Sequence, residues 1–325
     1  IARREGELGD ALADGACYLY RSGEEYAEIF PVWNWRQLPG VTCPQGAGPL
    51  PAFSRNNLPT AWVGGVSDGR NGGMAAEYTR LLGTPPAGQA EDRRLAAKKA
   101  WFCFDDQVVC LGAGITAGAA VADPLLTTVN QCLLRGPVRA SAGGAVQTLA
   151  PGAAAPPALD WVEHDGVRYR FLGPQPVVLA TGPRTGNWRA VRQTGDVPKD
   201  DITRDLFHLA VDHGVRPAGG SYAYVLQPAD PDRQPAVELL ANTPQLQAAR
   251  AGTRIQAAFY GPGALRYGPD RTLMVDAPCL LLLDTATHRV HVADPLHARR
   301  SLTITLDGQP REVALPQGER AGSTV

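Results

Sequence analysis

The stretch Leu159–Leu172, LDWVEHDGVRYRFL, decides the fold class. Its two halves, LDWVEH and VRYRFL, flank Asp165-Gly166. An Asp-Gly pair between two short runs rich in branched and aromatic side chains is a strong signal for a two-residue β-hairpin. We therefore expect two antiparallel strands joined at residues 165 and 166, with His164 at the end of the first strand.

The same pattern recurs along the chain. Residues 301–306, SLTITL, alternate apolar and polar side chains and precede a second turn signal at Asp307-Gly308. Further segments have the composition of strands, namely SYAYVLQP (221–228), IQAAFYG (255–261), PCLLLLD (278–284) and RVHVAD (289–294). Short strands separated by turns are typical of β-sandwiches and barrels, so we expect an all-β protein.

Other segments break this pattern. Residues 89–100, QAEDRRLAAKKA, have acids early and bases late, which predicts a helix. Residues 136–158 are rich in Gly, Ala and Pro and are expected to form a long surface loop, with further loops at 84–92 and 194–202. A domain boundary is expected near residues 236–245.

Composition excludes several classes of function. The chain has 325 residues and a net charge of −1, so no basic face is indicated and nucleic acid is not an expected partner. Gly (36) and Pro (28) are frequent, which fits a loop-rich β protein. No apolar run approaches the ~18 residues of a membrane span, so no membrane partner is expected. The opening IARREGELGD does not have the apolar core of a signal peptide.

The cysteines do not form a zinc-binding pattern. No two of them are spaced as CxxC. Most lie in apolar stretches, which favours buried free thiols. The best alternative is a disulfide between Cys103 and Cys110, across a hairpin at Asp105-Asp106. The six positions are Cys17, Cys43, Cys103, Cys110, Cys132 and Cys279.

Common catalytic motifs are missing from the sequence, which contains no GxSxG, P-loop or HExxH motif. The glycine-rich stretch 64–73, GGVSDGRNGG, does not follow a βα unit, so we interpret it as a surface turn rather than a phosphate site. His213 follows Asp212, but neighbouring strand residues point to opposite faces, which favours a structural histidine. His288 and His291 would also face opposite sides of a strand, which argues against a shared metal.

An unusual segment lies at residues 24–40, EEYAEIFPVWNWRQLPG. It combines three carboxylates with four aromatic rings. Trp33 and Trp35 are two residues apart and share one face if the segment is extended. The pair either covers the core, which we favour because tryptophan buries well, or forms a stacking platform for a flat ligand such as a sugar ring.

This segment also belongs to a series of motifs that resembles polysaccharide lyase family eight, which contains the chondroitin AC, hyaluronan and xanthan lyases. The series starts with a glycine-ended turn at 12–16. The motifs follow in order as EEYAEIFPVWNWRQLPGVT (24–42), GGVSDG (64–69), AKKAWFCFDDQVVCLGAGI (97–115), TTVNQC (127–132), GNW (186–188), FHLAVDHGVRP (207–217), YAYVLQP (222–228), LANTPQLQA (240–248) and ADPL (293–296).

The resemblance implies the architecture. It predicts a large antiparallel β-supersandwich of the galactose mutarotase-like type at residues 1–237. A small C-terminal β-sandwich would follow at residues 238–325. Members of the family also carry an N-terminal α/α toroid, which is absent from this chain. The all-β class expected from the strand pattern agrees with this prediction.

The resemblance also implies a reaction. Family members cleave uronic-acid-containing polymers by metal-independent β-elimination: a base removes the proton at C5, and the bond to the oxygen on C4 breaks. The tyrosine, histidine, asparagine and main arginines of that machinery come from the helical domain. The expected partners are therefore an acidic polysaccharide and the helical toroid of the same enzyme. No cofactor and no metal are expected.

Some site residues carry over by resemblance. Glu25 matches a glutamate of the catalytic network, where a fixed carboxylate shifts the pKa values of its neighbours. Glu28 stands where relatives carry an asparagine close to the substrate, so it places a negative charge beside an anionic polymer. Arg70 and Asn71 are candidates to line the cleft, since arginine suits a carboxylate or sulfate. Asp68 alone offers too few carboxylates for a calcium site.

We therefore expect the β-domain portion of a lyase for glycosaminoglycans such as chondroitin, chondroitin sulfate or hyaluronan, inactive without its helical domain. A lyase for xanthan or another uronate polymer is the first alternative. A non-catalytic carbohydrate-binding or scaffold module is the second. The family acts on extracellular polymers, which implies a secreted or periplasmic protein.

Overall fold

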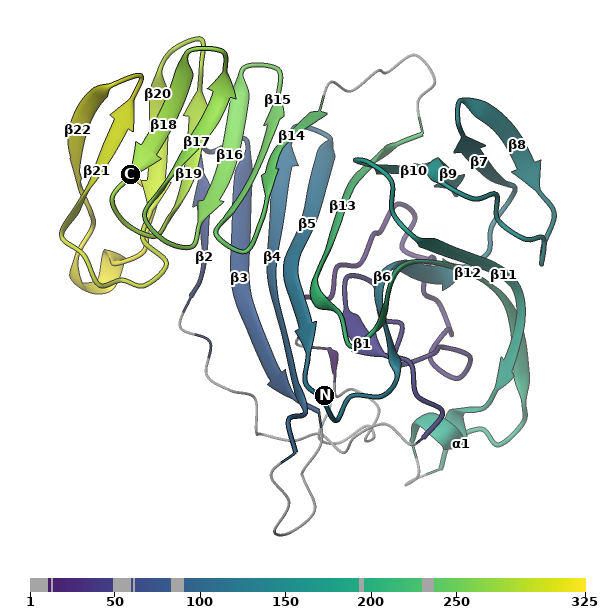
Figure 1. Cartoon of the computed structure of the whole chain (residues 1–325). Coiled ribbons are helices and arrows are strands. Elements are labelled where there is room, and N and C mark those ends of the chain that lie inside the picture. Colours follow the sequence, from purple (N-terminus) through teal and green to yellow (C-terminus); the bar gives the residue numbers. More distant parts are fainter. Residues whose placement is uncertain are drawn as a thin grey trace. The chain divides into compact units, whose positions relative to one another are not determined.

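The computed structural model describes residues 11–12, 14–48, 60, 62–82, 91–192, 196–229 and 237–325 (Figure 1). Its regular elements are nearly all antiparallel strands, beside the four-residue helix α1 (Trp188–Val191) and the short 3-10 turn η2 (Gly318–Arg320). The expected all-β class is confirmed. By their contacts, the residues form two compact units, one from 1–58, 80–95 and 116–218, the other from 59–79, 96–115 and 219–325.

The first unit contains two antiparallel groups of strands. One is a four-stranded sheet in the order β1-β6-β12-β11. The other consists of neighbours in the order β10-β9-β7-β8. Their bounds are β1 (Thr42–Pro44), β6 (Pro124–Leu133), β7 (Val138–Ala142), β8 (Ala145–Leu149), β9 (Leu159–His164), β10 (Val167–Phe171), β11 (Val177–Gly186) and β12 (Ile202–Val215).

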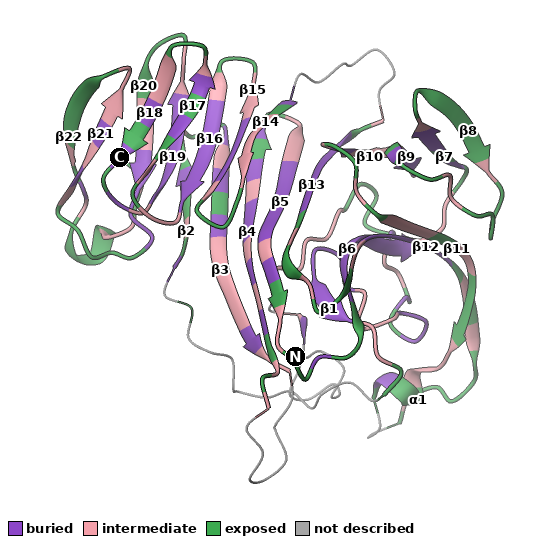
Figure 2. Cartoon of the chain, viewed as in Figure 1, coloured by how far each residue is buried: buried purple, intermediate pink, exposed green. Residues whose placement is uncertain are grey.

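Aromatic side chains join these two groups of strands. His164 of β9 stacks on Phe207 of β12 with ring centroids 4.3 Å apart, and Tyr169 of β10 lies 5.7 Å from the same ring. Figure 2 shows β6 and the adjoining part of β12 as mostly buried. A second core gathers under the aromatic segment, from Ala11, Ile29, Val32, Trp33, Leu38, Val41, Cys43 and Leu206.

The second unit contains three groups of strands. Strands β2, β3, β4, β5 and β13 are neighbours in that order, and two smaller sheets follow as β14-β15-β16-β19-β20 and β17-β18-β21-β22. The bounds are β2 (Val63–Ser67), β3 (Gly72–Leu81), β4 (Arg94–Phe104), β5 (Gln107–Ala117), β13 (Ala218–Pro228), β14 (Val237–Asn242), β15 (Leu246–Ala251), β16 (Arg254–Phe259), β17 (Gly263–Gly268), β18 (Arg271–Val275), β19 (Cys279–Asp284), β20 (Arg289–Ala293), β21 (Ser301–Leu306) and β22 (Gln309–Ala314).

The two smaller sheets share one hydrophobic core. It includes Ile255 and Leu281 from one sheet and Leu273 and Ile304 from the other, all at most 3% exposed. Alternating side chains of each strand point into this core, which is the arrangement of a β-sandwich. Residues 237–314 therefore form the small sandwich that the sequence predicts at the C-terminal end.

The second unit extends beyond this sandwich because side chains tie the sandwich to earlier strands. Gln256 Nε2 donates to the carbonyl of Cys103 at 2.7 Å, and Asn242 Nδ2 donates to the carbonyls of Gly112 and Tyr222. The two units defined by contacts therefore do not divide at the domain boundary that the sequence predicts between residues 237 and 238. That boundary stays a prediction, and residues 230–236 lie outside the described part.

The helix predicted at residues 89–100 is wrong where the structure describes it: β4 begins at Arg94. Burial from Arg94 to Lys99 alternates with a period of two, as in a strand. The charges that suggested a helix pair two residues apart, Arg93 with Glu91 and Arg94 with Asp92. Residues two apart lie on the same face of an extended chain, so these charge pairs fit a strand.

The long loop predicted at residues 136–158 is also wrong in part, because β7 and β8 form a hairpin within it. Residues 84–90 and 194–195 of the other two predicted loops lie outside the described residues. The turns predicted at Asp165-Gly166 and Asp307-Gly308 are confirmed.

No disulfide joins any two of the six cysteines, all of which lie in the described part, so the Cys103–Cys110 alternative is wrong. Cys103 is exposed rather than buried, while Cys110, Cys132 and Cys279 are buried as expected. Among the described helices, none is both long and apolar enough to cross a membrane.

Candidate active site

The segment that carries Glu25 is fastened to the end of β6 through its backbone. The Leu133 N–H donates to the Glu25 carbonyl at 3.0 Å. Two residues beyond β6, Arg135 Nη2 donates to the Glu24 carbonyl at 3.0 Å. Backbone carbonyls of the segment are therefore tied to β6 and to the residues that follow it.

The Glu25 carboxylate folds back onto the residues before it. Its Oε1 accepts hydrogen bonds from the N–H groups of Arg21 at 2.9 Å and Ser22 at 2.7 Å and from the Ser22 hydroxyl at 3.1 Å. Its Oε2 accepts from the Gly23 N–H at 3.0 Å. Glu25 is 6% exposed. Burial alone would raise its pKa, but the backbone hydrogen bonds prevail and lower it to about 2.

A chain of buried polar side chains lies beneath this loop. The Tyr26 hydroxyl accepts from the Leu19 N–H at 3.2 Å and donates to Asn130 Oδ1 at 3.0 Å. Asn130 Nδ2 then donates to the hydroxyl of Tyr169 at 2.7 Å and to Cys132 Sγ at 3.5 Å. The loop, β6 and β10 are therefore joined through one amide.

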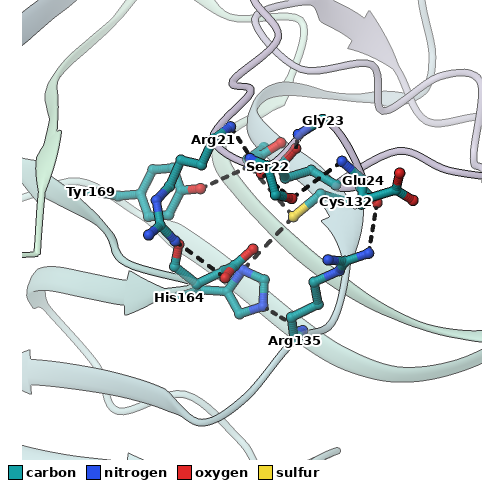
Figure 3. A network of polar contacts seen from close by, with 11 residues as sticks. Arg21, Ser22, Gly23, Glu24, Cys132, Arg135, His164 and Tyr169 are labelled. Atoms are coloured by element: carbon teal, nitrogen blue, oxygen red, sulfur yellow. Dashed lines mark hydrogen bonds and ion pairs between the residues drawn. The ribbon is translucent and has the colours of Figure 1, made fainter.

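His164 extends the network toward the end of β6, as Figure 3 shows. Its Nε2 accepts from the Arg135 N–H at 2.9 Å, so the proton of the neutral ring is on Nδ1. Nδ1 lies 3.8 Å from Cys132 Sγ. Burial lowers the pKa of His164 to about 4 and raises that of Cys132 to about 12. The pair is a neutral imidazole beside a thiol.

The Asp165-Gly166 turn reaches the same loop. Arg21 Nη1 donates to the Asp165 carbonyl and lies 3.3 Å from its carboxylate (Figure 3). A side chain at position 166 would collide with this guanidinium, and the backbone φ there is +71°. Glycine is thus required both by the turn and by the close approach of Arg21.

This arrangement provides a fixed negative charge and no proton shuttle. Glu25 stays ionised at any pH well above 2. The pKa values of Tyr18, Tyr26 and Tyr169 are raised, mainly by burial, so these phenols stay protonated near neutral pH. None of these four groups has the pKa of a general base.

The aromatic residues after Glu25 form a connected cluster. Trp33 is 8% exposed, and its ring centroid lies 5.6 Å from that of Trp35 with the planes 79° apart. Phe30 contacts both rings at 5.4 Å. The indole of Trp33 donates to the Gln131 carbonyl at 3.1 Å. The prediction that the tryptophan pair covers the core is confirmed, and the rings fix the segment that follows Glu25.

Glu28 is exposed and has a backbone φ of +54°. This left-handed conformation is unfavourable for a glutamate and much less so for asparagine or glycine. The turn therefore gives a physical reason why an asparagine suits this position. The predicted role of Glu28 in substrate binding stays a prediction.

Arg70 and Asn71 lie in the second unit, at the turn between β2 and β3. Arg70 Nε donates to Asp105 at 2.6 Å and is exposed. Asn71 is only 2% exposed: its Oδ1 accepts from the Asp105 N–H at 3.1 Å, and its Nδ2 donates to Asp68. Asn71 thus fastens two hairpin turns together. The prediction that both residues line a cleft stays a prediction.

Other residues considered from the sequence have structural contacts. Asp68 accepts the backbone N–H groups of Arg70 and Asn71. His213 Nε2 lies 2.8 Å from the Thr127 hydroxyl. Within the described ranges, no group of three or more His, Cys, Asp or Glu residues is arranged to hold a metal ion. The expectation that no metal is required stays a prediction.

Comparisons with known proteins match this chain over nearly its whole length. The model of the polysaccharide lyase family 8 super-sandwich domain matches residues 2–238, and that of the C-terminal beta-sandwich domain of the same family matches residues 238–303. The chain belongs to polysaccharide lyase family 8. The resemblance seen in the sequence is confirmed.

Family 8 proteins with curated functions are similar to the chain. A chondroitinase-AC of Pedobacter heparinus is 33% identical over 99% of this chain and 46% of that protein. A hyaluronate lyase of Thermasporomyces composti is 32% identical over 87% of this chain and 36% of that protein. A solved structure of a chondroitinase AC lyase has a TM-score of 0.81 and 32% identity, covering 98% of this chain and 47% of that one. The chain spans about half the length of these family 8 relatives, or less.

Sequence reasoning missed most of the network around Glu25. His164 was placed correctly at a hairpin end, but its hydrogen bond to Arg135 was not foreseen. Asn130 lies inside the quoted TTVNQC motif, and Tyr169 lies inside the predicted hairpin. A polar side chain within an otherwise apolar strand was the available signal, because buried amides require partners.

Proposed function

We propose that this chain is the β-domain part of a lyase that cleaves uronic-acid-containing glycosaminoglycans, namely chondroitin, chondroitin sulfate or hyaluronan. The reaction is a metal-independent β-elimination at the uronate. Membership of family 8 and similarity to a chondroitinase-AC and a hyaluronate lyase support this substrate class. The protein is secreted or periplasmic, where such polymers occur.

The single observation that carries the proposed mechanism is the state of the Glu25 carboxylate. Oε1 accepts from three donors and Oε2 from one, although a carboxylate oxygen can accept about two. Oε2 therefore has capacity for one more donor. In this proposal it accepts an N–H or O–H from the helical domain of the same enzyme, which lies outside this chain.

The role of Glu25 follows from its ionisation. With a pKa of about 2, it neither gives nor takes a proton during turnover. Its constant negative charge keeps a nearby arginine or histidine protonated and aimed at the uronate, and a tyrosine of the helical domain removes the C5 proton. Glu25 is thus a positioning residue in this mechanism. Exposed Glu28 is the further polymer contact proposed in the first unit, and exposed Arg70 is the one proposed in the second unit. Buried Asn71 holds the turn that presents Arg70.

The test is an assay for unsaturated uronate, followed by its ultraviolet absorbance, with chondroitin, hyaluronan, xanthan and alginate as substrates. The full-length product of the gene should act on chondroitin or hyaluronan, and this chain alone should not. Activity on xanthan alone would replace the proposed substrate. Sugar binding without product in either form would make the protein a non-catalytic module.

The Glu25→Gln variant tests the mechanism. Gln keeps the size of the side chain but removes the charge, so kcat should fall by about 100-fold, as when one preorganised electrostatic contact is lost. Glu24→Gln is the matched control, since Glu24 is the exposed neighbour, and its activity should stay within about twofold of the parent. Equal activity of the two variants would remove Glu25 from the mechanism.

A further inference from the structure

The register of three strands collects arginines around one tryptophan. On β9, Trp161 and Glu163 are two residues apart and face the same side. Their partners on β10 are Arg170 and Arg168, and β7 places Arg139 opposite Glu163. We call these five residues the Trp161 patch (its strands β7, β9 and β10 are marked in Figure 1).

The patch lies on the side of these strands that is turned away from β12. The alternate residues of β9 point the other way, since Val162 is fully buried and His164 stacks on Phe207 of β12. Because side chains alternate across a strand, Trp161 and Glu163 lie on the opposite side, where Glu163 is itself only 6% exposed. Trp161 is half-buried, and the Arg139 side chain is 49% exposed.

Contacts within the patch hold the guanidinium groups beside the indole. Glu163 Oε2 accepts from Arg139 Nη1 at 3.0 Å, and its Oε1 accepts from Arg168 Nε at 2.7 Å. The guanidinium of Arg168 lies 4.5 Å from the centre of the Trp161 ring, and that of Arg139 lies 5.9 Å from it. One carboxylate thus orients two cations around an aromatic surface.

The charges of the patch do not balance. Three arginines face a single glutamate, which leaves two positive charges within the five residues. Arg170 Nε and Nη2 are buried and make no hydrogen bond to any described residue. The Arg170 guanidinium therefore adds a positive charge that no carboxylate of the patch neutralises.

We propose that the Trp161 patch is a second binding site for an acidic polysaccharide. The indole packs against the apolar face of a sugar ring, and Arg139 and Arg168 bind its carboxylate or sulfate groups. Arg170, which is partly exposed, turns toward a further acidic group. The identity of the polymer rests on the proposed function.

The position of the patch suits a polymer that also reaches the Glu25 loop. Trp161 lies four residues from Asp165, about 13 Å along an extended strand. Asp165 in turn contacts Arg21 of that loop. The hairpin β9–β10 therefore connects the patch to the candidate active site, and a polymer of several sugar units can occupy both.

The experiment measures binding, not turnover, and uses the 325-residue chain. Calorimetric titration measures the affinity of the chain for size-defined chondroitin sulfate oligosaccharides. Titration with neutral dextran is the sugar control. Trp161→Ala and Arg139→Gln should each weaken binding by about tenfold, and Trp161→Phe should retain most of it. Arg266→Gln is the matched control, an exposed strand arginine outside the patch, and should change the affinity by less than about twofold.

Ionic strength gives a second readout. Arg139→Gln removes one contact to an anionic group, so its affinity should fall less steeply with salt than that of the parent. Trp161→Ala should leave the salt dependence unchanged. If Trp161 and Arg139 had only a structural role, the salt dependence of the affinity would not differ between these two variants.

Several outcomes would overturn the proposal: a chain that does not bind acidic oligosaccharides, one that binds dextran equally well, or patch variants with the affinity of Arg266→Gln. If Trp161→Ala fails to fold, the exposed Arg139→Gln variant decides. Binding that depends on the patch, without unsaturated product from the full-length protein, would refute the proposed function and leave this site standing. If the full-length protein forms unsaturated product but binding does not depend on the patch, this binding site is refuted and the proposed function stands.

Discussion

The backbone N–H of Arg135 donates to Nε2 of His164 at 2.9 Å, and the guanidinium of the same arginine donates to the Glu24 carbonyl at 3.0 Å. One residue therefore connects the β9–β10 hairpin to the loop that carries Glu25. The hydrogen bond from the Arg135 N–H requires an unprotonated Nε2, so protonation of His164 at low pH would break it.

Stability should fall as the pH falls from about 6.5 to about 4. Burial lowers the pKa values of both His164 and His208 from 6.5 to about 4. In this window the unfolded chain takes up protons that the folded chain does not, so the free energy of unfolding decreases as the pH falls. The loss should reach at most about 3 kcal/mol per histidine at the acidic end, measured by urea unfolding across the window.

Removing both histidines should flatten this dependence. The double variant His164→Gln/His208→Gln retains a hydrogen-bond acceptor near Arg135 and has no imidazole to protonate at either position. The control is His288→Gln, which replaces an exposed histidine and should leave the slope as in the parent. An equally steep slope in the double variant would assign the effect to other groups.

Glu28→Asn should stabilise the chain. The residue has a φ of +54°, and asparagine adopts this left-handed region at lower cost than glutamate. The expected gain is about 0.5–1 kcal/mol in the free energy of unfolding, measured in urea. Glu24→Asn removes the same charge four residues earlier, at a position without positive φ, and should give no gain. Equal gains from both variants would point to charge rather than backbone conformation.

The ion pair of Arg80 with Asp14 should be strongly coupled. Their side chains are 5% and 3% exposed, and burial lowers the pKa of Arg80 to about 10. Arg80→Met alone should cost about 3–5 kcal/mol, because it removes a buried guanidinium from a buried carboxylate. Adding Asp14→Leu should recover part of this loss, as measured by a double-mutant cycle in urea.

The pair of Arg94 with Asp92 is the matched comparison. Their side chains are 63% and 42% exposed, so solvent screens the pair and a double-mutant cycle there should give a much smaller coupling energy. Similar coupling energies for the two pairs would contradict the importance assigned to burial.

Gly186→Ala should destabilise the aromatic segment. A methyl group at this position, the last residue of β11, would collide with the backbone carbonyl of Pro31. Backbone atoms cannot turn aside as a side chain does, so about 1–3 kcal/mol of stability should be lost. Thermal and urea unfolding measure the change. Gly261→Ala, which has no atom within 4 Å of the new carbon, should be nearly neutral.

Local signals in the sequence were sufficient for several strands and for the two Asp-Gly turns, but not for β4 or the β7–β8 hairpin. The Asp-Gly turns at 165–166 and 307–308 form because these pairs adopt positive φ readily and the flanking residues favour strands. The helix at 89–100 failed because acids early and bases late also describe an extended segment with charge pairs two residues apart. In β4, tertiary burial outweighs intrinsic helix propensity.

The site was predictable only where one residue stood out within a motif. Glu25 could be proposed from the EEYAE stretch, but its hydrogen bonds to Arg21, Ser22 and Gly23 depend on a loop conformation that has no sequence signature. The contacts of His164 with Arg135 and of Asn130 with Tyr169 join segments at least 29 residues apart. Such pairings follow from strand order and register, which a single sequence does not specify.

Besides its aromatic packing, the loop from residue 21 to residue 37 is held at several points through its main chain. Glu25 accepts three backbone N–H groups, and Gln131 accepts the Asn34 N–H while donating to the carbonyls of Asn34 and Gln37. Because an amide group is the same in every residue except proline, such fastening does not depend on which side chains the loop displays. Exchanging the exposed residues of this loop would therefore change what it presents to solvent, while buried Glu25 and Gln131 keep its shape constant.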